Sequence, residues 1–429
     1  MPLCLPAYIH AIAWTYLSTP RNVFYRLIPE GIYSLYGAAF ILAFAYFPFI
    51  VILTSCGLAG MDRRLEDAAR LQRGPISVFT TITLPLAGPH IFSGAVIVFL
   101  FSLFDYGVPA LMRVQVYPVE TVAQFSVFYN EGAATALSLP VIVLGLLLVS
   151  IQWRFMQDRS YVTLDTGSRI AGSVDLGRLQ PLALGFLSVV IGIAVILPIV
   201  ILVNQAGSAQ SYKIVFDNSA GEVSSSITRA LIAATIVIVL GYFLSEYTEK
   251  RNSRMPAAMD YLTLSPLAFP ATALGIGLIY CWNRPFTDFI YQGTLILVLA
   301  YIGRFLPLAV RASMANSKQI GSSLKEMALL TERSWTRRFF RIDLPLAIPG
   351  LAAGWVIVFI LCMGELGATL LVIPPGNGSI SLKIYTLMHY GANQVVAAMA
   401  LVLVFVNLTV SAGVFLGIRR LLLPRQTVP

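Results

Sequence analysis

The sequence predicts an all-α polytopic membrane protein with about ten transmembrane helices, arranged as two tandem parallel repeats. Three observations predict this class. Of the 429 residues, 57% are hydrophobic and 11% are charged, whereas a soluble domain carries about 25% charged residues. The hydrophobic residues are gathered in long runs, and one stretch of the chain repeats after 260 residues. The low charge content excludes a water-soluble enzyme of this size.

The long apolar runs are the candidate membrane spans. A run of about 18 or more apolar residues is long enough for a helix to cross a bilayer. Ten apolar segments take up most of the chain and leave no room for a large soluble domain. The expected spans are 3–17, 31–54, 84–110, 137–153, 182–204, 227–245, 260–282, 293–313, 345–373 and 394–418.

The basic residues indicate the orientation of these spans. The chain has a formal net charge of +9, and alternate connections differ in their content of Lys and Arg. One set of connections, which includes 63–73 and 318–341, holds twenty of these residues, and the other set holds six. Because cytoplasmic loops carry an excess of Lys and Arg, the first set is expected in the cytoplasm. This spread over short loops argues against a nucleic-acid-binding surface, which needs one basic patch.

An internal repeat defines the predicted domain organisation. Residues 79–107 and 339–367 share 13 of 29 positions without a gap, where shared apolar composition would give about two or three. Both copies follow a basic loop, so each repeat unit contains an even number of spans. The expected division is a first half over 1–153 with four spans, a cytoplasmic linker over 154–181, and a second half over 182–429 with six spans.

The first repeat therefore lacks about two N-terminal helices. Leu5-Pro6-Ala7 aligns with Phe269-Pro270-Ala271, so the expected spans 182–204 and 227–245 have no partner ahead of residue 5. A misassigned start site, a truncated chain and an asymmetric pore would each produce this pattern.

Each repeat has a cytoplasmic loop with the pattern of a short helix, a break and a second helix that enters the membrane. Leu65, Ala68 and Ala69 share one face of the first short helix, and its charged residues lie away from that face. Such a helix suits a groove on a partner protein or the headgroup region of the bilayer, and both interpretations stay open. The loop residues of interest are Glu66, Asp67, Ala68, Ala69, Arg73 and Gly74, and in the second copy Glu326, Ala328, Leu329 and Arg333.

These loops resemble the EAA loop of the permease subunits of binding-protein-dependent ABC importers. The family pattern is Glu/Asp-Ala-Ala, three residues, a glycine, and then Ile-x-Leu-Pro. Both copies here have arginine in place of the glycine, and the acid of the second copy, Glu326, lies one position early. The matching residues are Asp67-Ala68-Ala69, Arg73 and Ile82-Thr-Leu84-Pro85, then Met327-Ala328-Leu329, Arg333 and Ile342-Asp-Leu344-Pro345.

Two such halves in one chain look like the iron(III)-type importers, to which Arg304–Pro307, Glu365–Thr369 and Leu387–Gly391 are also similar. The resemblance implies the ABC importer permease fold in the bacterial inner membrane and a translocation pathway for iron(III). It also implies two partners: a dimer of ATPase subunits on the EAA loops and an extracytoplasmic substrate-binding protein. Fused permeases for thiamine, phosphonates and polyamines look much alike. A secondary transporter is the alternative from another class, and a purely structural scaffold does not explain the paired loops.

Three of the ionisable residues in the predicted spans are candidates for the translocation path. Asp105 and Glu365 are equivalent in the repeat, and Arg304 lies near the middle of its span. Such groups cost about 2.5–3.5 kcal/mol near the bilayer centre and usually face the bundle interior or a water-filled cavity. The two acids are expected around the central axis near the outer mouth, or alternatively as helix-end acids that reach interfacial water. Arg304 is expected to line the pathway or to pair with Glu365.

No pattern in the sequence indicates a catalytic residue, a metal site or a cofactor. The four cysteines and three histidines are far apart and form no CxxC pair. The phosphate-binding pattern GxxxxGK[ST] is absent, because Gly-Lys does not occur in the chain. ATP hydrolysis is therefore expected in a separate partner protein, and the remaining expected contact is membrane lipid rather than nucleic acid.

Overall fold

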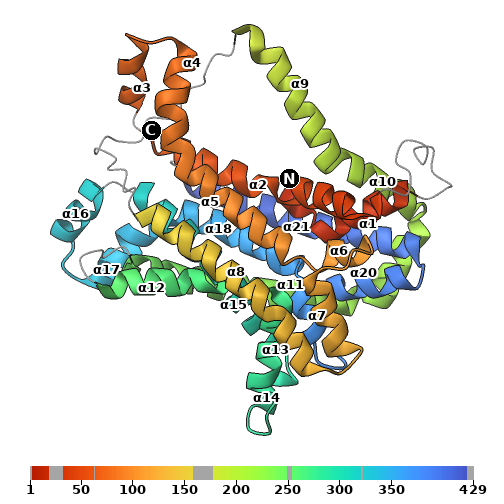
Figure 1. Cartoon of the computed structure of the whole chain (residues 1–429). Coiled ribbons are helices and arrows are strands. Elements are labelled where there is room, and N and C mark those ends of the chain that lie inside the picture. The colour runs from red at the N-terminus through yellow and green to blue at the C-terminus, as the bar shows by residue number, and fades with distance from the viewer. Residues whose placement is uncertain are drawn as a thin grey trace, which may run out of the picture.

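The computed structural model describes residues 2–18, 32–61, 63–157, 177–248, 254–319 and 322–422. Within these ranges every regular element is a helix, which confirms the predicted all-α class. The long helices lie side by side in one bundle (Figure 1), which includes α2 (Leu35–Ala59), α8 (Glu131–Gln157) and α21 (Asn393–Leu422). The predicted linker 154–181 falls largely outside the described residues.

Eight helices in the described ranges are long and apolar enough to cross a membrane, or nine when one bent pair counts as a span. In the bent pair, Met255–Ala268 and Ala271–Trp282 meet at 104°. The first helix ends before Phe269, because a residue that precedes proline is disfavoured in the α conformation. Phe269 and Pro270 form the break between the two helices.

The predicted span 3–17 is too short to cross the bilayer. It forms η1 (Pro2–Cys4) and α1 (Ala7–Leu17), and eleven residues at 1.5 Å each cover about 16 Å. All eleven residues of α1 are buried, because it packs among α2, α6 (Gly107–Leu111) and α10 (Leu197–Ala206). The described residues therefore hold eight or nine candidate spans, where the sequence predicts about ten in the whole chain.

The sequence repeat is also a structural repeat. Helices of the first copy reappear 260 residues later, beginning at equivalent positions. The most regular pairs are α2 with α15 (Leu295–Gln319), α5 (Leu84–Leu103) with α18 (Leu344–Met363), and α6 with α19 (Gly367–Val372). The helix α11 (Ala209–Thr248) packs along α15 and α18, and the described residues of the first half contain no counterpart of it.

Within the part of the chain that the structure describes, three π-helical turns interrupt the long helices, and each one directly precedes a Leu-Pro pair. They are η4 (Phe79–Thr83), η6 (Gly192–Ile196) and η8 (Phe339–Asp343). In each turn the leucine N–H donates to the carbonyl five residues earlier, as Leu84 does to Phe79. The following proline has no N–H to donate and its ring crowds the carbonyl four residues earlier, and at these three places a wider π turn accommodates the break. The pairs Leu139-Pro140 in α8 and Leu306-Pro307 in α15 lie within regular α-helices instead.

The two halves interlock through the bundle. Near the N-terminus, Asn407 Nδ2 on α21 donates to the carbonyl of Cys4 at 3.1 Å. On the other side, the Trp153 indole on α8 donates to Asp260 at 3.1 Å, and Asp260 lies in α12 (Arg254–Leu264). Each half thus contributes a long helix to the packing of the other half.

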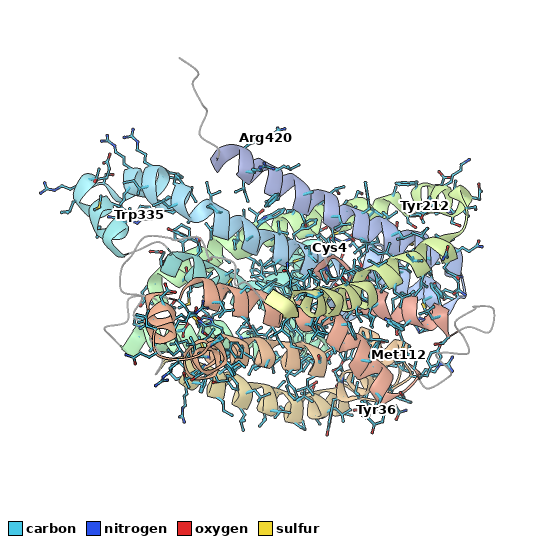
Figure 2. All side chains as sticks on the ribbon, turned by 90° about the horizontal axis from the view of Figure 1, so that it is seen from above. Cys4, Tyr36, Met112, Tyr212, Trp335 and Arg420 are labelled. Carbon is cyan, nitrogen blue, oxygen red and sulfur yellow. The ribbon has the colours of Figure 1, made fainter. Side chains whose placement is uncertain are left out.

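The bundle has two distinct ends. Figure 2 shows Trp335 at one end, Tyr36, Met112 and Tyr212 at the other, and Cys4 between them. The Trp335 end carries α3 (Arg63–Arg70), α4 (Pro75–Val78), α16 (Ser322–Thr331) and α17 (Trp335–Arg338). These helices belong to the basic loops, so this end corresponds to the predicted cytoplasmic side.

Candidate functional site

A small cavity lies between the two halves, where the equivalent helices α5 and α18 end. Its volume is about 60 Å³. A water molecule needs about 10–15 Å³ of such space, so this cavity has room for a few waters. The cavity brings together all three ionisable residues singled out in the sequence. Its polar lining includes Tyr8, Tyr46, Asp105, Arg304 and Glu365.

Asp105 follows the last turn of α5 and is held on both carboxylate oxygens. Oδ1 accepts the backbone N–H of Val108 at 2.8 Å, and Oδ2 accepts the hydroxyl of Tyr46 at 2.7 Å. The first bond satisfies an N–H at the start of α6, where the helix has no partner of its own. Asp105 therefore joins three elements, α2, α5 and α6, at the cavity wall.

Glu365 occupies the same place in the second half and is bound more tightly. Its oxygens accept the N–H of Ala368 at 2.8 Å, the N–H of Thr369 at 2.9 Å and the Thr369 hydroxyl at 2.6 Å. The residue is 5% exposed. A carboxylate at a helix N-terminus is stabilised by the unpaired N–H groups and by the helix dipole, which offsets the cost of burying this charge beside α19.

Arg304 extends from α15 into the lining of the same cavity. Its guanidinium carbon lies 5.8 Å from the centre of the Phe305 ring. Among the described residues its buried Nε has no hydrogen-bond partner, and no ion pair within 4 Å joins it to Glu365. In this conformation Arg304 lines the cavity and does not form the pair with Glu365.

Two tyrosines connect the halves beside the cavity. The hydroxyls of Tyr106, at the start of α6, and Tyr385, on α20 (Ile380–His389), are 2.8 Å apart. Sequence reasoning missed this pair and also Tyr46, because a tyrosine in an apolar segment gives no signal that separates a pathway wall from ordinary packing.

Arg229 was also missed, although a signal was present. It lies inside the predicted span 227–245 and is 2% exposed, and a buried arginine in an apolar helix needs a partner. Its Nε donates to the carbonyl of Ser225 at 2.9 Å, and Nη2 donates to the carbonyl of Gly378. Arg229 therefore holds the loop that leads into α20.

The two cytoplasmic loops present apolar side chains to solvent at the same end of the molecule (Figure 1). In the first loop, Leu71 is 87% exposed and Ile76 is 80% exposed. In the second, Leu330 is 86% exposed and Trp335 is 55% exposed. Exposed apolar groups on a cytoplasmic protrusion are typical of a protein interface.

The small residues of the loops differ between the copies. Ala68 and Asp67 are exposed, whereas the equivalent Ala328 is 4% exposed and faces a second cavity of about 160 Å³ under α16. Leu329 and Arg333 are exposed, and Ala69 is half-buried. The side chain of Glu326 lies outside the described residues.

Neither loop depends on a glycine to turn. Gly74 precedes α4 with φ −67°, and Ser334 stands at the equivalent position with φ −77°. Both values are open to any residue. Arg73, at the family's glycine position, donates from Nη1 to the Thr81 hydroxyl at 3.3 Å.

Comparison with known proteins gives a family match over most of the chain. The sequence profile of the binding-protein-dependent transport system inner membrane component matches residues 1–161 and 237–422. The Fe(3+)-transport system permease protein FbpB 2 of Haemophilus influenzae is 22% identical over 391 residues, which are 90% of this chain and 75% of that protein. The ferric transport system permease protein FbpB of Actinobacillus pleuropneumoniae is 22% identical over 87% of this chain, which spans 58% of that relative.

A third relative matches a smaller part of the chain. The putative 2-aminoethylphosphonate transport system permease protein PhnV of Salmonella typhimurium is 24% identical over 43% of this chain and 69% of its own length. The family match, the apolar helices and the paired loops agree on a multi-pass inner-membrane permease. The chain belongs to the family of inner membrane components of binding-protein-dependent transport systems.

Proposed function

We propose that this chain forms the translocation pathway of an ABC importer for iron(III), with the path running through the cavity between its halves. One observation carries the proposal. In each half a single continuous helical stretch runs from the cytoplasmic loop to a cavity acid: Pro75–Leu103 leads to Asp105, and Trp335–Met363 leads to Glu365. A displacement of either loop is therefore delivered to the cavity wall.

The partners follow from this arrangement. A dimer of ATPase subunits docks on the exposed loops, one subunit on each, through apolar residues such as Leu71 and Leu330. An extracytoplasmic binding protein delivers the substrate at the opposite end. ATP-driven closure of the dimer moves the two loops together, the attached helices shift, and the closed cavity opens to one side. The permease itself hydrolyses nothing and supplies the path.

Iron(III) is the substrate best supported. The relatives that match 90% and 87% of the chain are named as Fe(3+) or ferric transport permeases, whereas the phosphonate permease matches 43%. The cavity lining carries two carboxylates and one guanidinium, so its formal charge of −1 favours a cation. Thiamine, a phosphonate and a polyamine are the competing substrates.

The experiment is reconstitution. The chain is co-expressed with the ATPase and binding protein of its importer, the complex is placed in vesicles, and uptake of radioactive iron(III) is compared with uptake of the three competitors. Uptake of iron(III) that requires ATP supports the proposal. ATP-dependent uptake of another solute would support the importer function and contradict iron(III) as its substrate. Uptake driven by an ion gradient without ATP would contradict both claims.

A further inference from the structure

Each cytoplasmic loop is tied by a polar contact to the π turn that begins the following membrane helix. In the first half, the hydroxyl of Thr83, the last residue of η4, donates to Oε1 of Glu66 on α3 at 2.5 Å. Arg73, in the turn after α3, donates to Thr81 of the same π turn at 3.3 Å. These two contacts attach α3 and the turn that follows it to the start of the membrane helix.

The second half makes an equivalent tie with different chemistry. Nη1 of Arg341, in η8, lies 3.5 Å from Oε1 of Glu332, in the turn after α16. Arg341 is the repeat counterpart of Thr81. The same π-turn position thus receives a polar group from the loop in both halves, once from an arginine and once from a glutamate. Two different residue pairs that preserve one contact indicate that the contact itself matters.

The position of the tie coincides with the break in the helix. Pro85 has no N–H to offer the carbonyl of Thr81, and Pro345 has none for the carbonyl of Arg341. A helix interrupted in this way can bend at the break. The third described π turn, η6, also precedes a Leu-Pro pair, at Leu197-Pro198, but it directly follows the helix α9 (Gln180–Ile191) and not a loop. Leu-Pro does not produce a π turn by itself, because Leu139-Pro140 in α8 and Leu306-Pro307 in α15 lie within regular α-helices. The ties to a cytoplasmic loop distinguish η4 and η8 from η6.

We infer that three pairs position the loops during the transport cycle: Thr83 with Glu66 and Thr81 with Arg73 in the first half, and Arg341 with Glu332 in the second. They hold the short loop helix, the break and the π turn as one rigid lever, so that a push from the ATPase reaches the cavity acids instead of being absorbed at the turn. This inference rests on the proposed importer function for its consequence. The lever itself is a property of the chain alone.

Distances within one half test the lever without any substrate. Spin labels are placed at Leu71, which is 87% exposed, and at Phe99 on α5, which is 50% exposed, after replacement of the accessible Cys56 and Cys281 by serine. The parent chain is expected to give one narrow distance distribution. Thr83→Val, which removes the hydroxyl and keeps the shape, is expected to broaden the distribution, and Thr83→Ser is expected to restore it.

The chain offers matched controls in the same segments. The hydroxyl of Thr80 bonds only to the carbonyls of Ile76 and Ser77 in its own helix, so Thr80→Val should leave the distribution narrow. In the second half, the distance distribution of Arg341→Met is compared with that of Arg337→Met, in which an exposed arginine on α17 is replaced. Arg341→Met should broaden the distribution and Arg337→Met should not. If Thr83→Val and Thr80→Val give the same distribution, the lever is overturned.

The functional readout is iron(III) taken up per ATP hydrolysed by the reconstituted complex. A single partly buried hydrogen bond contributes modestly to folding, so Thr83→Val should keep ATPase binding and lower this ratio about two- to fivefold. Thr83→Ser should stay near the parent value. A ratio equal to that of Thr80→Val would overturn the positioning role. If the parent complex binds no ATPase, the proposed importer function is refuted. If the parent transports normally and Thr83→Val transports equally well, only the positioning role of the ties is refuted.

Discussion

Asp105 and Glu365 stand 260 residues apart at the same place in the two repeats, and each carboxylate accepts the backbone N–H three residues further on, from Val108 and Ala368. Each acid thus fixes the start of a short helix to the end of a long one while lining the central cavity. This capping offsets part of the cost of placing the half-buried Asp105 and the buried Glu365 in the bundle. In the proposed pathway the two acids also form part of the charged wall.

The two acids should respond differently to loss of charge. Glu365→Gln leaves one carbonyl oxygen for three buried donors, so we expect a loss of about 1–3 kcal/mol in the free energy of unfolding. Asp105→Asn can keep both contacts, because the amide oxygen accepts from Val108 and the amide nitrogen can donate to Tyr46. Thermal unfolding of the purified chain in detergent should show a lower Tm for Glu365→Gln only. Equal Tm values for the two variants would contradict the capping account.

The charge of Asp105 can then be tested for transport in a variant that folds normally. If the acid lines the pathway, Asp105→Asn should lower ATP-dependent iron(III) uptake while ATPase binding persists. Uptake at the parent rate in the Asp105→Asn, Glu365→Gln double variant would assign both acids to structure alone.

Arg304 should be coupled in energy to the acid across the cavity. Arg304→Gln removes the positive charge beside two carboxylates, so we expect lower stability and weaker transport. Adding Asp105→Asn restores the charge balance and should recover part of the loss. A double-mutant cycle on Tm measures this coupling. Strict additivity of the two substitutions would show that Arg304 and Asp105 act independently.

The ATPase interface should depend on the exposed apolar residues of the loops. Leu71→Asp and Leu330→Asp place a charge where an apolar contact is expected, so co-purification of the ATPase should fall by about tenfold. Tyr36→Asp is the control, since Tyr36 is 86% exposed at the opposite end of the bundle. Ala328→Asp is a poorer probe because Ala328 is buried and the substitution would disturb α16 itself. Unchanged co-purification in both leucine variants would refute the docking surface.

Asp260 should be a stability determinant of the interface between the halves. It accepts the Trp153 N–H at 3.1 Å and pairs with Arg311 on α15 at 3.0 Å. Asp260→Asn weakens both contacts, and we expect a loss of about 1–3 kcal/mol. Asp288→Asn is the matched control, since exposed Gln292 donates to Asp288 within the same short segment. A Tm for Asp260→Asn no lower than that of the control would contradict this role.

The features that could be predicted from the sequence are those with a local signal. Apolar run length identified the long spans, Lys and Arg placed the loops at one end, and the shared residues of 79–107 and 339–367 located the structural repeat. The equivalence of Asp105 and Glu365 followed from that repeat, and the cavity brings the pair together with Arg304.

The features that could not be predicted depend on packing between distant segments. The segment that forms α1 is as apolar as a span, and only its enclosure by other helices makes it a short buried core helix. Ala68 and Ala328 are equivalent in sequence, yet Ala68 is exposed and Ala328 is buried. Ala328 lines a cavity together with Tyr242 and Glu246 of α11, a helix that has no described counterpart in the first half. Capping of the cavity acids likewise needs the backbone of α6 and α19 in place.

The central claim is that ATP-driven movement of the paired loops opens a path for iron(III) between the halves. It is tested most directly by iron(III) uptake into vesicles that contain the complete importer. The ATPase domains face the lumen, where ATP is enclosed, and the binding protein is added outside. The account predicts uptake that requires ATP and the binding protein and that falls when Leu71→Asp and Leu330→Asp are combined. Iron(III) uptake that continues at the same rate without ATP, or with both loop substitutions present, would contradict it.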